Sequence, residues 1–250
     1  MDDPSTDDNS RSTSVGIKYK SWFGLLLDPQ FQLDDEYIDS LMMLTARKVE
    51  KCKHLLRVQF AIGDVLLSNL LRRTDGPYAA MKPGVLPSKC TYDWRQERTI
   101  FRYVLGRQSD YDTLWSEADI VYTRMNIGGN HWVMIGIDLV EGDLTVWDSL
   151  QAITPLEDLE KALKPMCTII PAILHWSGIL ALRPNLPMVP WRVRRCTVPQ
   201  QAGFTDCSIF CVRFFEYDVI GSKIDTLIQS NISLFRRQYA VQMWARRPFF

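Results

Sequence analysis

The sequence has no apolar stretch that approaches the roughly 18 to 20 residues of a membrane span, and its first ten residues, MDDPSTDDNS, lack the apolar segment of a secretory signal. It also has no excess of charge, because Lys plus Arg and Asp plus Glu each number 29 among 250 residues. This balance gives no reason to expect a nucleic acid or an anionic membrane as a partner. We therefore expect an intracellular protein whose function depends on a specific site.

Histidine and cysteine are also scarce, with three and six residues. The cysteines, at positions 52, 90, 167, 196, 207 and 211, are too dispersed for a disulfide scaffold, and we expect free thiols. The hydrophobic fraction of 46% is sufficient for a substantial core. We expect a single domain over residues 21–250, preceded by a disordered acidic tail over residues 1–20 that lacks apolar periodicity.

Apolar periodicity predicts helices near both ends of the chain and strands in the middle. Residues 131–139 and 144–150 are typical of two strands joined by the turn VEGD, and residues 191–198 of a further strand. Helices are predicted over 33–48, over 54–73 with a weak point at Gly63, over 154–165 with an end at Pro165, and from Cys207 to Gly221; the Gly- and Pro-rich segment 75–89 predicts a long loop. The pattern indicates an α+β fold.

Cys207 stands where the polar turn PQQAGFTD meets an apolar helical segment. A helix N-terminus favours the thiolate form of cysteine, and a carboxamide from Gln200 or Gln201 on the turn could reach a developing oxyanion. A cysteine at this position is more often a small buried apolar residue. Cys207 and Cys211 could alternatively be half of a metal site, but no second Cys or His pair has zinc-like spacing. We expect no metal and no cofactor.

Any general base must come from the three histidines. His54 lies in a basic stretch and is predicted to be a surface residue, and His175 lies in an apolar run and is predicted to be a packing residue. His131 opens the first predicted strand and Asp148 ends the second, so both lie at the open end of the hairpin.

The offset between His131 and Asp148 depends on the position of the turn. A turn centred on residues 141 and 142 places both side chains on one face but about four positions apart, roughly 13 Å. A different register or a β-bulge must therefore close this gap.

Three stretches in this order, HWVMIGIDL, VWDSL and VPQQAGFTDCSIF, resemble the ubiquitin-like-protein proteases, the SUMO-type cysteine protease family related to adenovirus proteinase. The resemblance covers roughly residues 31 to 220 and implies a papain-like fold with a central mixed sheet flanked by helices. It implies that Cys207 is the nucleophile, His131 the general base, Asp148 the residue that orients the base, and Gln201 the side-chain oxyanion donor. The backbone N–H of Cys207 would be a second oxyanion donor.

The substrates of this family are ubiquitin-like modifiers that end in two glycines, cleaved from an isopeptide bond to lysine or from a precursor tail. The implied partners are therefore SUMO or a NEDD8-like modifier and its conjugated proteins, without nucleic acid or membrane, and the implied state is a nuclear or nucleocytoplasmic monomer. Trp132 would form one wall of a narrow slot for the glycine tail. The resemblance also implies substrate contacts at Phe31 and Asp35.

The sequence departs from the family pattern at three points. Gln32 stands where the family commonly has tryptophan, and Ser208 follows the nucleophile where glycine is usual. The glycine before the cysteine is also displaced, with Gly203 followed by Phe204. The stretches LDDEYID and VPQQAGFTDC look most like the plant, transposon-associated branch of the family. The alternative function is thus a weak or inactive relative, possibly derived from a transposon, that binds a ubiquitin-like protein.

The C-terminal segment, residues 222–250, predicts a helix with four basic residues, Arg236, Arg237, Arg246 and Arg247. A solvated helix face is the first interpretation of these arginines. A docking surface for an acidic face of the modifier is the alternative.

Overall fold

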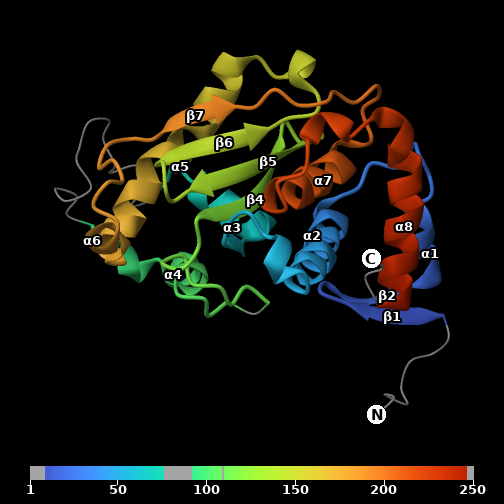
Figure 1. Ribbon diagram of the computed structural model, residues 1–250, viewed down its shortest axis with the longest axis horizontal. Coiled ribbons are helices and arrows are strands. Elements are labelled where there is room, and N and C mark those ends of the chain that lie inside the picture. Colours follow the sequence, from blue (N-terminus) through green and yellow to red (C-terminus); the bar gives the residue numbers. More distant parts are fainter. Residues whose placement is uncertain (1–8, 76–91, 109, 247–250) are drawn as a thin grey trace, which may run out of the picture. The chain divides into compact units, whose positions relative to one another are not determined.

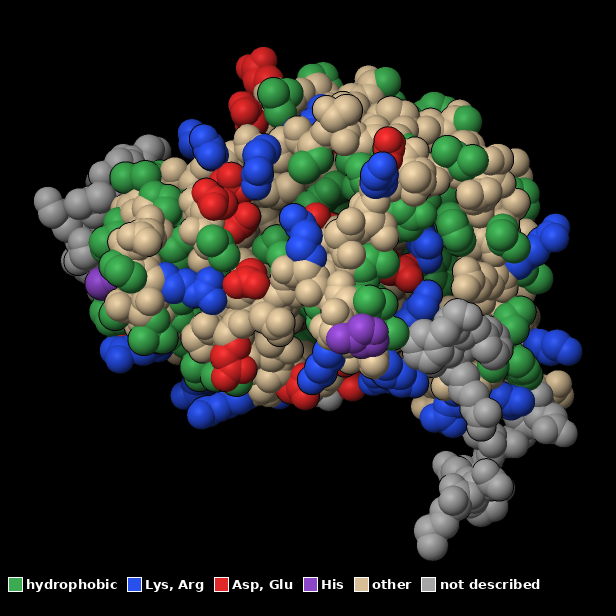
Figure 2. Space-filling view, in the orientation of Figure 1, with side chains coloured by type: hydrophobic (Ala, Val, Ile, Leu, Met, Phe, Trp, Pro, Cys, Tyr) green, Lys and Arg blue, Asp and Glu red, His purple; other side chains and the backbone are tan. Residues whose placement is uncertain are grey.

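The structure is a computed structural model that describes residues 9–75, 92–108 and 110–246. The chain divides into two compact units, the first comprising Met1–Arg57 with Val198–Phe250 and the second Val58–Thr197. None of the helices in the described ranges has both the length and the apolar character needed to cross a bilayer. The visible face carries acidic and basic side chains interspersed, in agreement with the equal numbers of the two charges (Figure 2).

A five-stranded mixed sheet forms the framework of the second unit (Figure 1). Its strands, in spatial order, are β3 (Phe60–Ile62), β4 (Ile120–Ile127), β5 (His131–Asp138), β6 (Asp143–Trp147) and β7 (Arg192–Arg195). The inner strands β4, β5 and β6 are antiparallel, whereas the edge strands β3 and β7 run parallel to their neighbours. The predicted hairpin and the predicted strand near residue 193 are confirmed.

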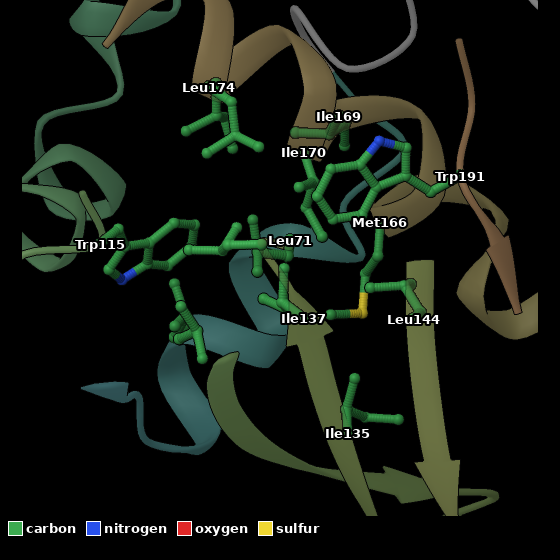
Figure 3. Close-up of a cluster of buried hydrophobic side chains, with 14 of the residues drawn as sticks. Leu71, Trp115, Ile135, Ile137, Leu144, Met166, Ile169, Ile170, Leu174 and Trp191 are labelled. Carbon is green, nitrogen blue, oxygen red and sulfur yellow. The ribbon is translucent and has the colours of Figure 1, made fainter. Parts of the chain in front are cut away.

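The helices of the second unit are α3 (Val65–Leu71), α4 (Arg98–Val104), α5 (Leu156–Trp176) and α6 (Ile179–Leu182), with 3-10 turns at Trp94–Gln96 and Gln151–Ile153. Figure 3 shows the core between the sheet and α5, where Ile135, Ile137 and Leu144 face Met166 and Ile170. These five side chains are fully buried. Each contributes about 1.5–3 kcal/mol on transfer from water, and together they anchor the hairpin that carries His131 and Asp148.

Two helix predictions in this unit are wrong. The predicted helix over 54–73 is interrupted by β3, because FAI is buried and pairs with β4, and Asp64 then caps the separate helix α3. The helix predicted to end at Pro165 instead continues to Trp176. The apolar residues that follow Pro165 pack against the sheet, and this burial offsets the backbone hydrogen bond that an internal proline removes.

The first unit contains four helices in its described residues, α1 (Lys20–Leu25), α2 (Asp35–Glu50), α7 (Cys207–Val219) and α8 (Ile232–Ala245), and 3-10 turns at Lys53–Leu55, Ile224–Thr226 and Gln229–Asn231. Helix α2 packs against α7 and α8. Asp34 caps α2 by accepting a hydrogen bond from the Tyr37 backbone N–H at 3.3 Å. The predicted helices at 33–48 and 207–221 are confirmed. Of the helix predicted over 222–250, only Ile232–Ala245 is α-helical in the described residues, and two 3-10 turns precede it.

The expected disorder over residues 1–20 does not hold from residue 9 onward. Strands β1 (Ser10–Thr13) and β2 (Gly16–Tyr19) form an antiparallel hairpin. Side-chain contacts hold it to the rest of the unit, because the Arg11 guanidinium lies 4.2 Å from the centre of the Trp244 ring and Lys18 forms an ion pair with Glu36. Residues 1–8, most of the predicted loop over 75–89, Cys90 and Arg247 lie outside the described residues. That residues 21–250 form a single domain stays a prediction.

Candidate active site

The hairpin register brings His131 and Asp148 together. Strands β5 and β6 pair Asp138 with Asp143 and Met134 with Trp147, so the connecting loop is residues 139–142. In this register Asp148 is offset by two positions from the point opposite His131, on the same face, and such a diagonal pair is within reach of a long side chain. The predicted turn was placed one residue too far along the chain. The four-residue loop closes the gap without a bulge.

The imidazole and the carboxylate form a buried hydrogen-bonded pair. His131 Nε2 lies 2.7 Å from Asp148 Oδ1, and the two side chains are 1% and 0% exposed. An imidazole held by a carboxylate has a fixed orientation, and the carboxylate stabilises the imidazolium that forms when the ring accepts a proton. The predicted pairing of base and orienting residue is therefore present within the second unit.

Asp148 has two further hydrogen-bond donors. The Leu150 backbone N–H donates to Oδ1 at 2.8 Å, and the Arg195 guanidinium donates to Oδ2. Burial by itself would raise the pKa of the Asp148 carboxyl, but the hydrogen bonds from His131, Leu150 and Arg195 outweigh burial and hold its pKa below the ordinary value. The carboxyl is therefore ionised at neutral pH, as its orienting role requires.

Arg195 is a member of this site that sequence reasoning missed. It lies on β7 opposite Val146, on the same sheet face as Asp148, and also donates to the Thr154 carbonyl at 2.8 Å. His131, Asp148 and Arg195 thus lie at neighbouring strand ends, since His131 begins β5, Asp148 directly follows β6 and Arg195 ends β7. The alternation WRVRRCTV predicts the strand, but only the sheet register shows that Arg195 is the arginine next to Asp148.

Cys207 is the first residue of α7 and is fully buried. This position at the start of a 13-residue helix, where the helix dipole favours negative charge, agrees with the prediction. Ser208 is also buried and donates to the Leu33 carbonyl at 3.3 Å. The side chain that replaces the family's usual glycine is therefore accommodated within the first unit.

Gln201 lies on the turn that precedes Cys207 and is 6% exposed. Its Nε2 donates to the Gly203 carbonyl at 2.6 Å, a contact that bends the turn back on itself. The oxyanion role of Gln201 stays a prediction.

The residues with predicted substrate contacts lie in both units. Phe31 is half-buried, with its ring edge-to-face on Tyr37 at 5.5 Å between centroids, and Asp35 is the exposed first residue of α2. Trp132 is buried and follows His131 on β5, so its side chain lies on the opposite sheet face from His131. Their substrate roles stay predictions.

The other two histidines have the environments expected of them. His54 is exposed in a 3-10 turn, and His175 is half-buried in the last turn of α5 beside Trp176. Cys52, Cys167, Cys196, Cys207 and Cys211 are present as thiols. Within the described ranges, no group of three or more His, Cys, Asp or Glu residues could hold a metal ion.

Comparisons with known proteins extend over both units. A family model described as the Ulp1 protease family, C-terminal catalytic domain, matches residues 32–247. A search of curated proteins gave no match. The solved catalytic domain of the Ulp1-like SUMO protease from Chaetomium thermophilum is 15% identical with a TM-score of 0.64, covering 98% of this chain and 85% of that chain.

Two further solved structures are similar over most of their length. The C-terminal Ulp1 protease domain in complex with Smt3, the yeast ortholog of SUMO, is 16% identical with a TM-score of 0.62, covering 97% of this chain and 90% of that one. The SUMO protease Ulp1 with its catalytic cysteine oxidised to a sulfonic acid is 15% identical with a TM-score of 0.62, covering 95% and 89%. The predicted α+β fold of the SUMO-protease type is confirmed.

Proposed function

This chain belongs to the Ulp1 protease family of cysteine proteases, and we propose that it hydrolyses the bond after the C-terminal Gly-Gly of SUMO or a similar ubiquitin-like modifier. The observation that carries the proposal is the buried His131–Asp148 pair, held by a third charged group, in a chain that has only three histidines. In the proposed site Cys207 is the nucleophile. The proposal requires the two units to bring the Cys207 sulfur within hydrogen-bond reach of the His131 ring.

The proposed reaction has two steps, formation of a thioester and its hydrolysis, and His131 carries the proton in both. Because Asp148 binds Nε2 of His131, Nδ1 is the nitrogen that takes the proton from the Cys207 thiol. The thiolate attacks the carbonyl carbon of the terminal glycine, and the Cys207 backbone N–H and the Gln201 carboxamide stabilise the oxyanion. Collapse breaks the C–N bond, the imidazolium gives its proton to the departing lysine or peptide amine, and a thioester remains. Water, deprotonated by His131, then releases the modifier.

The choice of a ubiquitin-like substrate is supported by the solved relatives that act on SUMO. A tail of two glycines fits a slot between aromatic side chains that excludes branched residues, and Trp132 and Phe31 are the proposed walls. Asp35 is proposed to contact the modifier. The weak or inactive alternative is less favoured, because Ser208 is accommodated by its bond to Leu33.

Several properties are proposed from the family resemblance alone. We propose that the protein acts as a monomer in the nucleus or nucleocytoplasm, without nucleic acid or membrane, and that it belongs to the plant, transposon-associated branch. A NEDD8-like modifier is the second candidate substrate.

The experiment uses SUMO, NEDD8 and ubiquitin, each with a thiol-reactive group at the C-terminus, and maps adducts on the protein by mass spectrometry. We expect an adduct on Cys207 with one modifier and none after Cys207→Ser. The matched control is Cys211→Ser, because Cys211 is also a buried thiol and lies one turn further along α7. An adduct at Cys211, or no adduct from a folded protein with any of the three modifiers, would contradict the proposal.

A further inference from the structure

Arg236 is a buried arginine on α8, and only 2% of its side chain is exposed. This finding corrects the interpretation of Arg236 as part of a solvated face, whereas its neighbour Arg237 is exposed. Removing a guanidinium from water is costly unless its N–H groups are hydrogen-bonded. The partners of Arg236 therefore indicate what its burial accomplishes.

Arg236 bonds to two turns that are distant in the sequence. On the nucleophile turn (residues 203–206), it donates to Asp206 Oδ1 at 2.9 Å and to the Thr205 carbonyl at 2.7 Å. On the turn that precedes α2, here called the entry turn (residues 28–31), it donates to the carbonyls of Asp28 at 3.2 Å and Phe31 at 3.3 Å. One rigid, planar fork of donors thus connects the residues directly before Cys207 with the turn that ends at Phe31.

Two further bonds strengthen the same connection. Thr205 Oγ1 donates to the Pro29 carbonyl at 2.7 Å, which joins the two turns directly. Gln229 Nε2 donates to Asp206 Oδ2 at 2.8 Å, so both carboxylate oxygens of Asp206 are bound. Because Asp206 directly precedes the proposed nucleophile, these bonds hold the backbone next to Cys207.

We propose that Arg236 is a positioning residue that sets the nucleophile turn and the entry turn at a fixed distance from each other. The inference rests on the proposed function, because it assigns the nucleophile to the first turn and a wall of the substrate slot to the second. A displacement of about 1 Å at a reacting centre can cost roughly 100-fold in rate. We therefore expect Arg236→Met to lower kcat/KM on a modifier substrate at least tenfold.

Arg236→Lys separates positioning from charge neutralisation. A lysine ammonium can pair with Asp206, but as a single point of charge it cannot reproduce a fork that reaches both turns. If Arg236 only neutralised Asp206, the lysine variant would be as active as the wild type. Positioning predicts that Arg236→Lys remains well below the wild type. Arg237→Met, a substitution of the exposed neighbour on the same helix, is the matched control and should be as active as the wild type.

The test combines hydrolysis of a fluorogenic modifier substrate with amide hydrogen exchange. In Arg236→Met and Arg236→Lys, exchange should accelerate in both turns while α2 retains its protection, whereas general unfolding would accelerate exchange in α2 as well. Unchanged exchange in either turn, acceleration throughout the unit in both variants, or wild-type kcat/KM in Arg236→Met would overturn the inference. If the wild-type protein itself hydrolyses no modifier substrate, the proposed function fails, and hydrogen exchange alone decides whether Arg236 couples the two turns.

Discussion

Replacing Arg195 with methionine should destabilise the protein in a pH-dependent way. The substitution leaves the fully buried Asp148 carboxylate without its guanidinium partner. Removing one partner of a buried ion pair typically costs about 3–5 kcal/mol in the free energy of unfolding. We expect about 3 kcal/mol at pH 7, because Asp148 keeps the bonds from His131 and the Leu150 N–H and because 11% of the Arg195 side chain is exposed.

The sign of the pH dependence follows from the lowered pKa of Asp148. A carboxyl whose pKa is lower in the folded state contributes stability that is fully present above its unfolded pKa, about 3.9, and is lost as the pH falls through the folded value. Burial raises the pKa of the Asp148 carboxyl, and without the Arg195 hydrogen bond less opposes this effect. Asp148 in the variant therefore takes up a proton at a higher pH than in the wild type. The stability gap between wild type and Arg195→Met should therefore be largest at pH 7 and narrow as the pH falls through the folded pKa of Asp148 in the variant towards its lower value in the wild type.

Urea unfolding in a pH series, from pH 7 down to the lowest pH at which the wild type stays folded, measures this gap. Arg192→Met is the matched control, because Arg192 lies on the same strand but its side chain is 79% exposed and its Nε is 3.7 Å from Asp143; we expect less than about 0.5 kcal/mol. Adding Asp148→Asn to Arg195→Met should recover part of the lost stability, because no buried charge remains without its partner. A gap below about 1 kcal/mol at pH 7, or a gap that stays constant throughout the pH series, would refute the reasoning.

Two other substitutions test the sheet and the orienting residue. Gly136→Ala should destabilise the protein by about 1–3 kcal/mol in urea unfolding, because the added Cβ would lie 2.9 Å from the Trp147 ring; a change below about 0.5 kcal/mol would show that the ring moves freely. Asp148→Asn should lower kcat on a modifier substrate by roughly 10³-fold or more, as in other triads that lose the orienting carboxylate. A loss of less than tenfold, in a variant with normal circular dichroism, would assign the orientation of His131 to another group.

The elements with strong local patterns could be predicted from the sequence. Alternation with β-branched residues defines the hairpin over 131–150, and helical spacing behind Asp34 defines α2. The order of the motifs identified the family. The hairpin and helix patterns each lie within about twenty consecutive residues, and the family signal lies in the order of such short segments. A single sequence is therefore sufficient to predict them.

The predictions that failed depended on tertiary contacts. The strand β3 lies within a stretch of helical apolar spacing, and its pairing with β4 overrides that spacing. Pro165 ends an isolated helix, but burial of the following apolar residues against the sheet sustains α5. The predicted hairpin register was wrong because the turn lies one residue earlier in the chain than predicted, which changes every pair of facing residues.

The two arginines that stabilise the proposed site could not be found from local pattern. Arg195 reaches Asp148 across 47 residues of sequence, and Arg236 reaches Asp206 across 30. Each is largely removed from solvent and has a carboxylate partner, and neither property is visible in a single sequence.

We propose that His131 is the general base for the Cys207 thiol. The most direct measurement is the rate of Cys207 alkylation by iodoacetamide at pH 6, followed by mass spectrometry in the wild type and in His131→Ala. An ordinary thiol, with a pKa of about 8.5, has less than about 1% thiolate at this pH. The account predicts rapid alkylation in the wild type and a loss of at least tenfold in His131→Ala. Equal rates in the two proteins would contradict it.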